Sequence, residues 1–200
     1  MKVKIKKEGK VESFKLINSW ADVTLETWLK LIDFETGTKT EEAEATLAAL
    51  TDIPKQLVKE LSLSDVAVIM SKIGELQAKQ DTELKRIIEI NGVEYAFHPD
   101  LSEISLGEYA DIEQFIKNGI DSSLPELMAV LYRPIKLKKS PTLYVIDAYD
   151  GDIRLRAEEM KQMSAEQVQS ALVFFYTLGK VLSEIMPLYL MERLKEMKTQ

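Results

Sequence analysis

The stretch Arg86–Glu113 constrains the fold most, because a turn signal, a strand end and a helix start follow one another within it. At its centre lies the dipeptide Asn91-Gly92, and both of these residues tolerate a positive φ. β-favouring side chains flank the dipeptide: Ile88, Ile90, Val93, Tyr95 and Phe97. This pattern predicts a β-hairpin with a two-residue type I′ turn. Pro99 should end the second strand at His98, because proline lacks the amide hydrogen that a β-ladder needs.

A helix start follows this hairpin. The Ser105 hydroxyl can cap the helix while the Glu108 carboxylate reaches back to the Ser105 amide, which is the capping-box pattern. Ile104 before the cap and Tyr109 after it can close a hydrophobic staple. Apolar residues then repeat at helical spacing: Leu106, Tyr109, Ile112 and Ile116. The spacing predicts a helix with one buried stripe.

The N-terminus carries a second hairpin pattern, in which Lys2, Lys4 and Lys6 alternate with Val3 and Ile5. A row of lysines on a strand suits contact with an anion or a nucleic acid. It also protects an exposed edge strand from pairing with other chains. We favour protection, because the chain as a whole is acidic.

Two segments of the chain share one pattern. Residues 22–25 (Asp-Val-Thr-Leu) align with residues 103–106 (Glu-Ile-Ser-Leu), and Trp28 aligns with Tyr109. Each segment follows a predicted hairpin and opens a predicted helix. The match indicates a divergent internal duplication of a hairpin-plus-helix unit. Two independently well-made helix starts explain it equally well, and both interpretations stay open.

Helical patterns fill most of the remaining chain. They cover residues 41–50, 54–61, 62–80, 123–132, 153–163 and 164–200, with a kink or break at Pro187. The predicted fold class is therefore α+β and mainly α: a compact helical bundle with two β-hairpins. We expect one hairpin-plus-helix unit over residues 1–83, a second over 84–135, and an irregular segment with C-terminal helices over 136–200. All three can also form one compact domain.

The segment Arg133–Asp152 breaks the helical pattern. It contains two prolines, three lysines and one short apolar run at residues 143–146, which leaves room for a single strand. Long irregular loops are uncommon unless they carry a function or are ordered by a partner. We therefore predict a partner contact here and on the C-terminal helices, which are apolar on more than one face. The candidate contact residues are Arg133, Lys136, Lys138, Lys139, Tyr144, Tyr149, Tyr189 and Met191.

Composition excludes several classes of function. Cysteine is absent, which rules out disulfides, thiolate nucleophiles and Cys-based metal sites. The net charge of -7 makes nucleic-acid binding an unfavoured function, because affinity for phosphate comes from accumulated Lys and Arg. The first residues lack the apolar core of a signal peptide, so we expect no secretion by that route. The most apolar run, residues 167–179, is too short to cross a bilayer of about 30 Å, so we expect no membrane span.

Residues that could carry chemistry are few and poorly placed for it. His98 is the only histidine, and its position at a strand end makes it a turn residue in our interpretation. Asp147, Asp150 and Asp152 surround Gly151, but their spacing does not match an EF-hand calcium loop, so we interpret them as a polar turn.

An acidic concentration lies around the predicted helix start: Asp100, Glu103, Glu108, Asp111 and Glu113. Negative charge near the start of a helix is favourable in itself, so a solvated helix face explains these residues. The sequence also lacks a Walker A loop, a G-x-G-x-x-G motif and a G-x-S-x-G motif. We predict no catalytic, cofactor-binding or metal-binding residues, no cofactor, and no enzymatic activity.

Three phrases of the sequence resemble one group of proteins. They are SWADVTLETW at residues 19–28, DLSEISLGEYADIE at 100–113 and MAVLYRP at 128–134. They look like parts of small proteins encoded by tailed bacteriophages, particularly crAss-like phages, over roughly residues 15–35 and 86–135. The resemblance implies a virion or assembly component in the virion or the host cytoplasm. Its partners would be portal, tail or other virion or assembly proteins, or further copies of itself. The resemblance transfers no functional residue.

A second class of function fits the residues as well. The lysines at Lys2–Lys10 and Lys136–Lys139 would suit a soluble adaptor or regulator that binds a host protein or a nucleic acid. Binding to DNA or RNA that depends on salt and on those lysines would favour this alternative.

Overall fold

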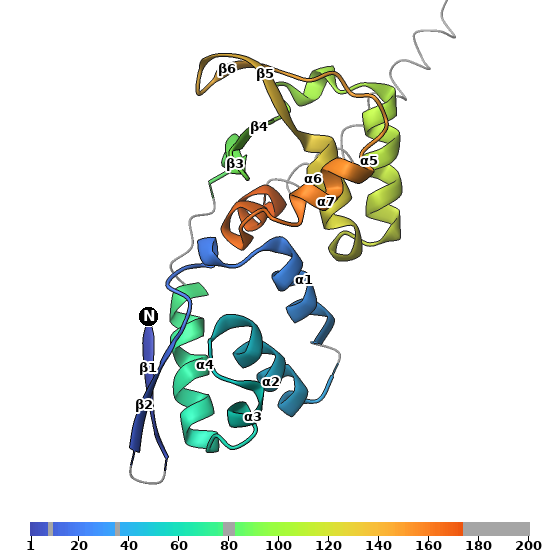
Figure 1. Ribbon diagram of the computed structural model, residues 1–200. Coiled ribbons are helices and arrows are strands. Elements are labelled where there is room, and N and C mark those ends of the chain that lie inside the picture. The colour runs from blue at the N-terminus through green and yellow to red at the C-terminus, as the bar shows by residue number, and fades with distance from the viewer. Residues whose placement is uncertain (8–9, 35–36, 78–82, 174–200) are drawn as a thin grey trace, which may run out of the picture.

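The computed structural model describes residues 1–7, 10–34, 37–77 and 83–173. Its elements form two halves that follow each other along an elongated molecule, residues 2–77 at one end and residues 87–173 at the other (Figure 1). Helices dominate the described residues, which also form two small antiparallel sheets. The predicted class, α+β and mainly α, is thus confirmed.

The N-terminal half consists of a hairpin, a 3-10 turn and helices. Its elements are β1 (Lys2–Lys7), β2 (Lys10–Lys15), η1 (Trp20–Asp22), α1 (Leu25–Phe34), α2 (Lys39–Leu50), α3 (Lys55–Val58) and α4 (Leu63–Gln77). The predicted hairpin is confirmed, with Val3 opposite Phe14 and Ile5 opposite Glu12. Val3 and Ile5 face inward and are buried in the N-terminal core, where they join Leu47, Leu50 and Ile69. This alternation fits a strand with one buried face.

The C-terminal half contains the larger sheet and a second set of helices. Its elements are β3 (Ile87–Ile90), β4 (Val93–Phe97), η2 (Leu101–Glu103), α5 (Leu106–Asn118), η3 (Asp121–Ser123), α6 (Leu124–Leu131), β5 (Tyr132–Ser140), β6 (Leu143–Ile146) and α7 (Arg154–Met160). Residues 165–173 are also helical. The strand order is β3-β4-β5-β6, with every neighbouring pair antiparallel. Helix α6 is buried almost throughout and forms the centre of the C-terminal core.

The predicted turn between β3 and β4 is confirmed. Asn91 has a φ of 51° and Gly92 a φ of 80°, and Ile90 pairs with Val93 across them. Positive φ at both central residues is what a type I′ turn requires. A Cβ atom on Gly92 would meet no atom within 4 Å, so backbone conformation alone favours glycine there.

The predicted capping box of α5 is also confirmed. The Glu108 amide donates to Ser105 Oγ at 3.3 Å, and the Ser105 amide donates to Glu108 Oε2 at 2.7 Å. Ile112 is buried as expected, but Leu106 is 84% exposed, so its assignment to the buried stripe is wrong. Leu106 is the first residue of the helix, and the helix reaches the core only from later turns, through residues such as Phe115.

An antiparallel β-bridge between Thr24 and Ser164 joins the two halves. The Leu25 amide donates to the Met163 carbonyl, and the Ala165 amide donates to the Val23 carbonyl, both at 2.7 Å. Next to the bridge, each half contributes a side chain to the core of the other half: Leu25 belongs to the C-terminal core, and Ala165 belongs to the N-terminal core.

The predicted strand at residues 143–146 is confirmed as β6, but the prediction of an irregular chain is wrong at residues 133–140, which belong to β5. These residues form most of the hairpin β5–β6, with a turn at Pro141-Thr142. Neither turn residue has a positive φ, so the turn does not need the Asn-Gly dipeptide from which a hairpin is usually predicted. Two register shifts interrupt its ladder, and bulges of this kind erase strict alternation of apolar and polar residues.

Strand β5 also crosses the predicted boundary between 135 and 136. Its first residues pair with β4, and the rest of the strand pairs with β6 alone. The predicted second and third units therefore share one sheet. The predicted C-terminal features around Pro187 lie outside the described residues.

The order hairpin, 3-10 turn, capped helix occurs twice, as β1–β2–η1–α1 and as β3–β4–η2–α5. The Thr27 amide donates to Thr24 Oγ1 in the first unit as the Glu108 amide donates to Ser105 Oγ in the second. The surroundings differ, because β1 and β2 form a sheet of their own whereas β4 continues into β5. A common origin of the two units stays a prediction.

Candidate functional site

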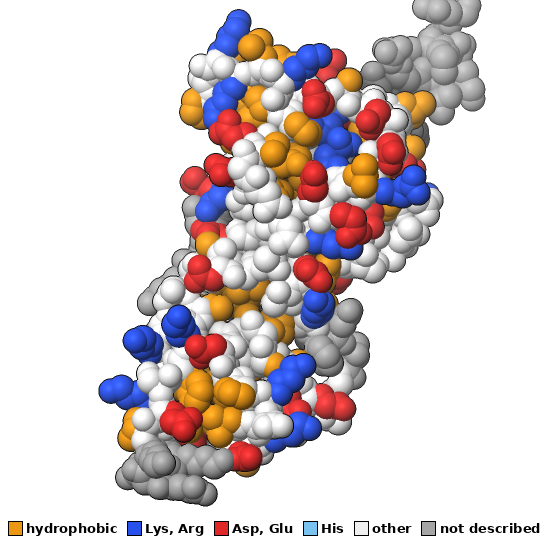
Figure 2. Space-filling model, viewed as in Figure 1, with side chains coloured by type: hydrophobic (Ala, Val, Ile, Leu, Met, Phe, Trp, Pro, Cys, Tyr) orange, Lys and Arg blue, Asp and Glu red, His pale blue; other side chains and the backbone are white. Residues whose placement is uncertain are grey.

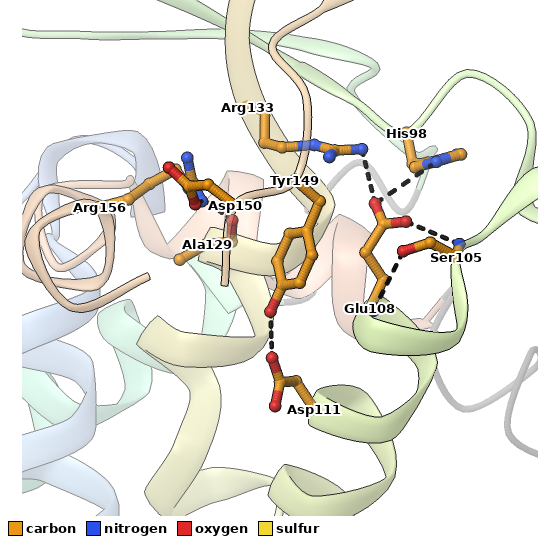
Figure 3. Close-up of polar contacts among 9 residues, drawn as sticks. All are labelled: His98, Ser105, Glu108, Asp111, Ala129, Arg133, Tyr149, Asp150 and Arg156. Atoms are coloured by element: carbon orange, nitrogen blue, oxygen red, sulfur yellow. Dashed lines mark hydrogen bonds and ion pairs between the residues drawn. The ribbon is translucent and has the colours of Figure 1, made fainter. Parts of the chain in front are cut away.

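Buried charges meet at the carboxylate of Glu108 (Figure 3). Its Oε1 atom lies 2.7 Å from Arg133 Nη2 and 3.7 Å from His98 Nε2. The side chains of Glu108 and Arg133 are each only 4% exposed. His98 follows β4, Glu108 lies in the first turn of α5, and Arg133 lies on β5. The cluster therefore connects the sheet to the start of α5.

A second set of contacts extends this cluster toward α7. The Tyr149 hydroxyl donates to Asp111 on α5, and the Arg133 guanidinium lies 5.8 Å from the centre of the Tyr149 ring. Arg156 Nε donates to the Ala129 carbonyl at 2.8 Å. Tyr149 thus holds the segment between β6 and α7 against α5, and Arg156 holds α7 against α6 (Figure 3).

The protonation equilibria of the cluster follow from its burial and its charges. Burial lowers the pKa of His98, and the Arg133 charge adds to this effect while Glu108 opposes it. Burial would raise the pKa of Glu108, but hydrogen bonds from Ser105, together with the charges of Arg133 and His98, leave that pKa below its usual range. Glu108 is therefore ionised and His98 neutral at neutral pH. The Arg133–Glu108 pair is a buried ion pair made by Arg133 Nη2, while the buried Arg133 Nε has no hydrogen-bond partner among the described residues.

The predicted solvated acidic face is corrected at Glu108, which is buried rather than exposed. Glu108 is buried together with Arg133, which β5 places against α5. The sequence around Arg133 did not predict this contact. His98 does follow a strand end, as predicted, but it is buried beside two charges instead of lying in an exposed turn.

A groove of about 470 Å³ lies between α1, α2 and α3. Its lining includes the small side chains Ala45, Ala48 and Ala49 of α2, with Lys30 and Lys55 among the charged residues. The alanines open the groove because their side chains leave space that larger residues would fill. Sequence periodicity indicated a helix here but no groove, since a groove depends on how far apart the helices pack.

The far end of the hairpin β5–β6 exposes an apolar patch, which we call the ribbon patch: Leu137, Leu143 and Val145. Their side chains are 54%, 60% and 51% exposed, and Leu137 lies opposite Val145 in the ladder. A hollow of about 100 Å³ lies among them and Lys139. Figure 2 shows lysines and hydrophobic side chains side by side at this end of the molecule.

The predicted contact residues fall into four groups. Lys136, Lys138 and Lys139 are exposed on β5, as a contact surface requires. Arg133 and Tyr144 are buried, the first against Glu108 and the second with its hydroxyl on the Phe97 carbonyl, so neither offers its side chain to a partner. Tyr149 is half-buried over Arg133. The candidates at positions 189 and 191 lie outside the described residues.

Sequence reasoning missed the ribbon patch itself. The run at residues 143–146 was the available signal, because alternate residues of a strand face opposite sides: Tyr144 and Ile146 are buried, whereas Leu143 and Val145 are exposed.

The described residues hold no group of three or more His, Cys, Asp or Glu side chains placed to bind a metal ion. Within the same residues, no helix has the length and apolar character needed to span a membrane. Comparison of the chain with protein-family models, with curated proteins and with solved structures found no match.

Proposed function

We propose that the protein is a non-enzymatic bacteriophage virion or assembly component that acts through protein–protein contacts, with the hairpin β5–β6 as its docking surface. The phage assignment rests on the sequence resemblance described above. The docking role rests on the ribbon patch, where three aliphatic side chains are each more than half exposed. Contiguous exposed apolar side chains on a strand are a feature of surfaces that bind other proteins.

The two hairpins of the chain differ in a way that supports this role. In strand β1, the exposed Lys2 and Lys4 alternate with inward-facing apolar residues, and such lysines deter pairing with a strand of another molecule. Among residues 83–173, strand β6 is the last strand of the larger sheet, and its four residues, Leu-Tyr-Val-Ile, include no charge and no proline. An edge strand without such protection suits a partner that covers it.

Mass spectrometry of purified particles and assembly intermediates of the encoding phage tests the proposal. We expect the protein in at least one of them, and its absence from all would refute the virion or assembly role. A double variant, Leu143→Thr with Val145→Thr, keeps β-favouring residues and removes the apolar face. It should lose particle association. Leu155→Thr, on α7 and 79% exposed, is the matched control and should keep it.

A second function is favoured by the exposed lysines Lys2, Lys4, Lys136 and Lys139. In this alternative the protein is a soluble adaptor or regulator that binds a host protein or a nucleic acid. DNA or RNA binding that weakens steeply with salt, and that is lost when these lysines are replaced, would support it. Binding to neither nucleic acid at low salt would remove the nucleic-acid form of this alternative.

A further inference from the structure

We infer that the hairpin β5–β6 binds an extended acidic segment of a partner protein, which adds to the sheet as a strand beside β6. The inference rests on the proposed docking role and names the chemistry of the partner: acidic residues alternating with aliphatic ones.

Strand addition requires backbone groups on the outer edge of β6 that can pair with a partner. In the order β3-β4-β5-β6, β5 is the only strand of the described residues that pairs with β6. The outward N–H and C=O groups of an edge strand can pair with an added strand, and pockets for alternate side chains then give specificity. The hollow among Leu137, Leu143 and Val145 is such a place for an aliphatic side chain of the added strand.

Binding of an acidic segment also requires positive charge around β6. Residues 135–146 contain three lysines and no acidic residue, in a chain whose net charge is -7. Lys138 pairs with Glu94 on β4. Lys136 and Lys139 are exposed and have no ion-pair partner among the described residues. Two uncompensated positive charges beside an apolar patch complement a segment that carries carboxylates.

The same side chains argue against other occupants. Single-stranded nucleic acid binds to basic surfaces on which aromatic rings stack with the bases. Here the exposed apolar side chains are aliphatic, and both rings of the hairpin, Tyr132 and Tyr144, are buried. A second copy of the chain paired β6 to β6 would bring like-charged hairpins together and leave Lys136 and Lys139 without a counter-charge.

The test uses the full chain and a fluorescein-labelled peptide of seven residues that alternates glutamate with valine. We expect a rise in fluorescence anisotropy on binding, and amide shifts in ¹⁵N spectra concentrated at residues 143–146. A peptide that alternates lysine with valine should not bind. A glutamate–valine peptide with alternate amides methylated should bind at least about ten-fold more weakly, because it keeps the charges and side chains but cannot complete the backbone ladder. Equal binding of both glutamate peptides would overturn strand addition.

Charge reversal on the protein is the second arm. Lys136→Glu with Lys139→Glu should weaken peptide binding about ten-fold at low salt. Lys2→Glu with Lys4→Glu makes the same change in net charge on the other hairpin and should leave the affinity unchanged. Equal losses in both double variants would refute a local contact.

Two competing outcomes are measured with the same protein. Binding of a labelled oligothymidylate in place of the glutamate peptide would assign the hairpin to nucleic acid. Concentration-dependent dimerisation in sedimentation experiments, abolished by Leu143→Thr with Val145→Thr, would assign it to a second copy. Both outcomes overturn the inference. If the threonine variant loses particle association while no acidic peptide binds, the proposed function stands and only the partner chemistry is wrong.

Discussion

Replacing Arg133 by methionine should destabilise the protein strongly at pH 8. Methionine keeps much of the side-chain volume but leaves the Glu108 carboxylate 4% exposed without its closest cation, which lies at 2.7 Å in the native chain. Removing one partner of a buried ion pair costs roughly 3–5 kcal/mol. The Ser105 amide still donates to the other carboxylate oxygen at 2.7 Å, so we expect a loss of about 3 kcal/mol, at the lower end.

The loss should shrink at pH 5.5. Arg133 contributes to the lowered pKa of His98, so its removal raises that pKa. His98 lies 3.7 Å from Glu108 and, once protonated, can replace part of the missing charge, worth about 1 kcal/mol. The variant thus loses less than 3 kcal/mol in acid.

Urea unfolding followed by circular dichroism at both pH values measures these free energies. The double variant Arg133→Met with Glu108→Gln is the control, because it removes both charges and should be more stable than the single variant. A loss below about 1 kcal/mol at pH 8 would refute the assignment of a charged, buried Glu108. A loss that is identical at both pH values would refute the role given to His98.

Three further perturbations test the turn, the histidine and the core. Gly92→Ala should cost about 1 kcal/mol in urea unfolding, because its φ is 80°, while Asn91→Gly should be nearly neutral. Burial lowers the pKa of His98, so as the pH falls the unfolded chain takes up a proton near pH 6.5, before the folded chain does. The free energy of unfolding should therefore decrease as the pH drops below that value. The decrease should be shallower in His98→Gln, which lacks the titrating group. Leu131→Ala, at a fully buried position, should lower the stability by about 2–5 kcal/mol, whereas Leu155→Ala, at a position 79% exposed, should change it by under about 0.5 kcal/mol. Equal pH profiles for native protein and His98→Gln, or equal losses for the two leucines, would contradict these assignments.

Local signals in the sequence predicted local structure well. Asn91-Gly92 forms the expected turn, and Ser105 with Glu108 forms the expected capping box, because both depend on residues within a few positions of one another. The fold class follows from summing such signals. The hairpin β5–β6 was missed because its turn uses Pro141-Thr142 without a positive φ and its ladder contains register shifts.

Contacts between distant segments could not be predicted in the same way. Glu108 has the sequence context of an ordinary exposed helix-start residue, and only the path of β5 brings Arg133 to it. The ribbon patch likewise depends on β6 being the last strand of the sheet, which no local pattern reveals. The predicted contact segment and the ribbon patch thus share one stretch of chain, but which of its residues are buried and which are exposed was decided only by the fold.

The bridge between Thr24 and Ser164 has a consequence for how the chain matures during synthesis. Ala165 fills a place in the N-terminal core, yet it leaves the ribosome after almost every other described residue. Domains generally begin to fold from the N-terminus as they are made. Here the N-terminal core is complete only after the helix at residues 165–173 has been synthesised. We therefore expect nascent chains that end before residue 160 to be protease-sensitive in both halves.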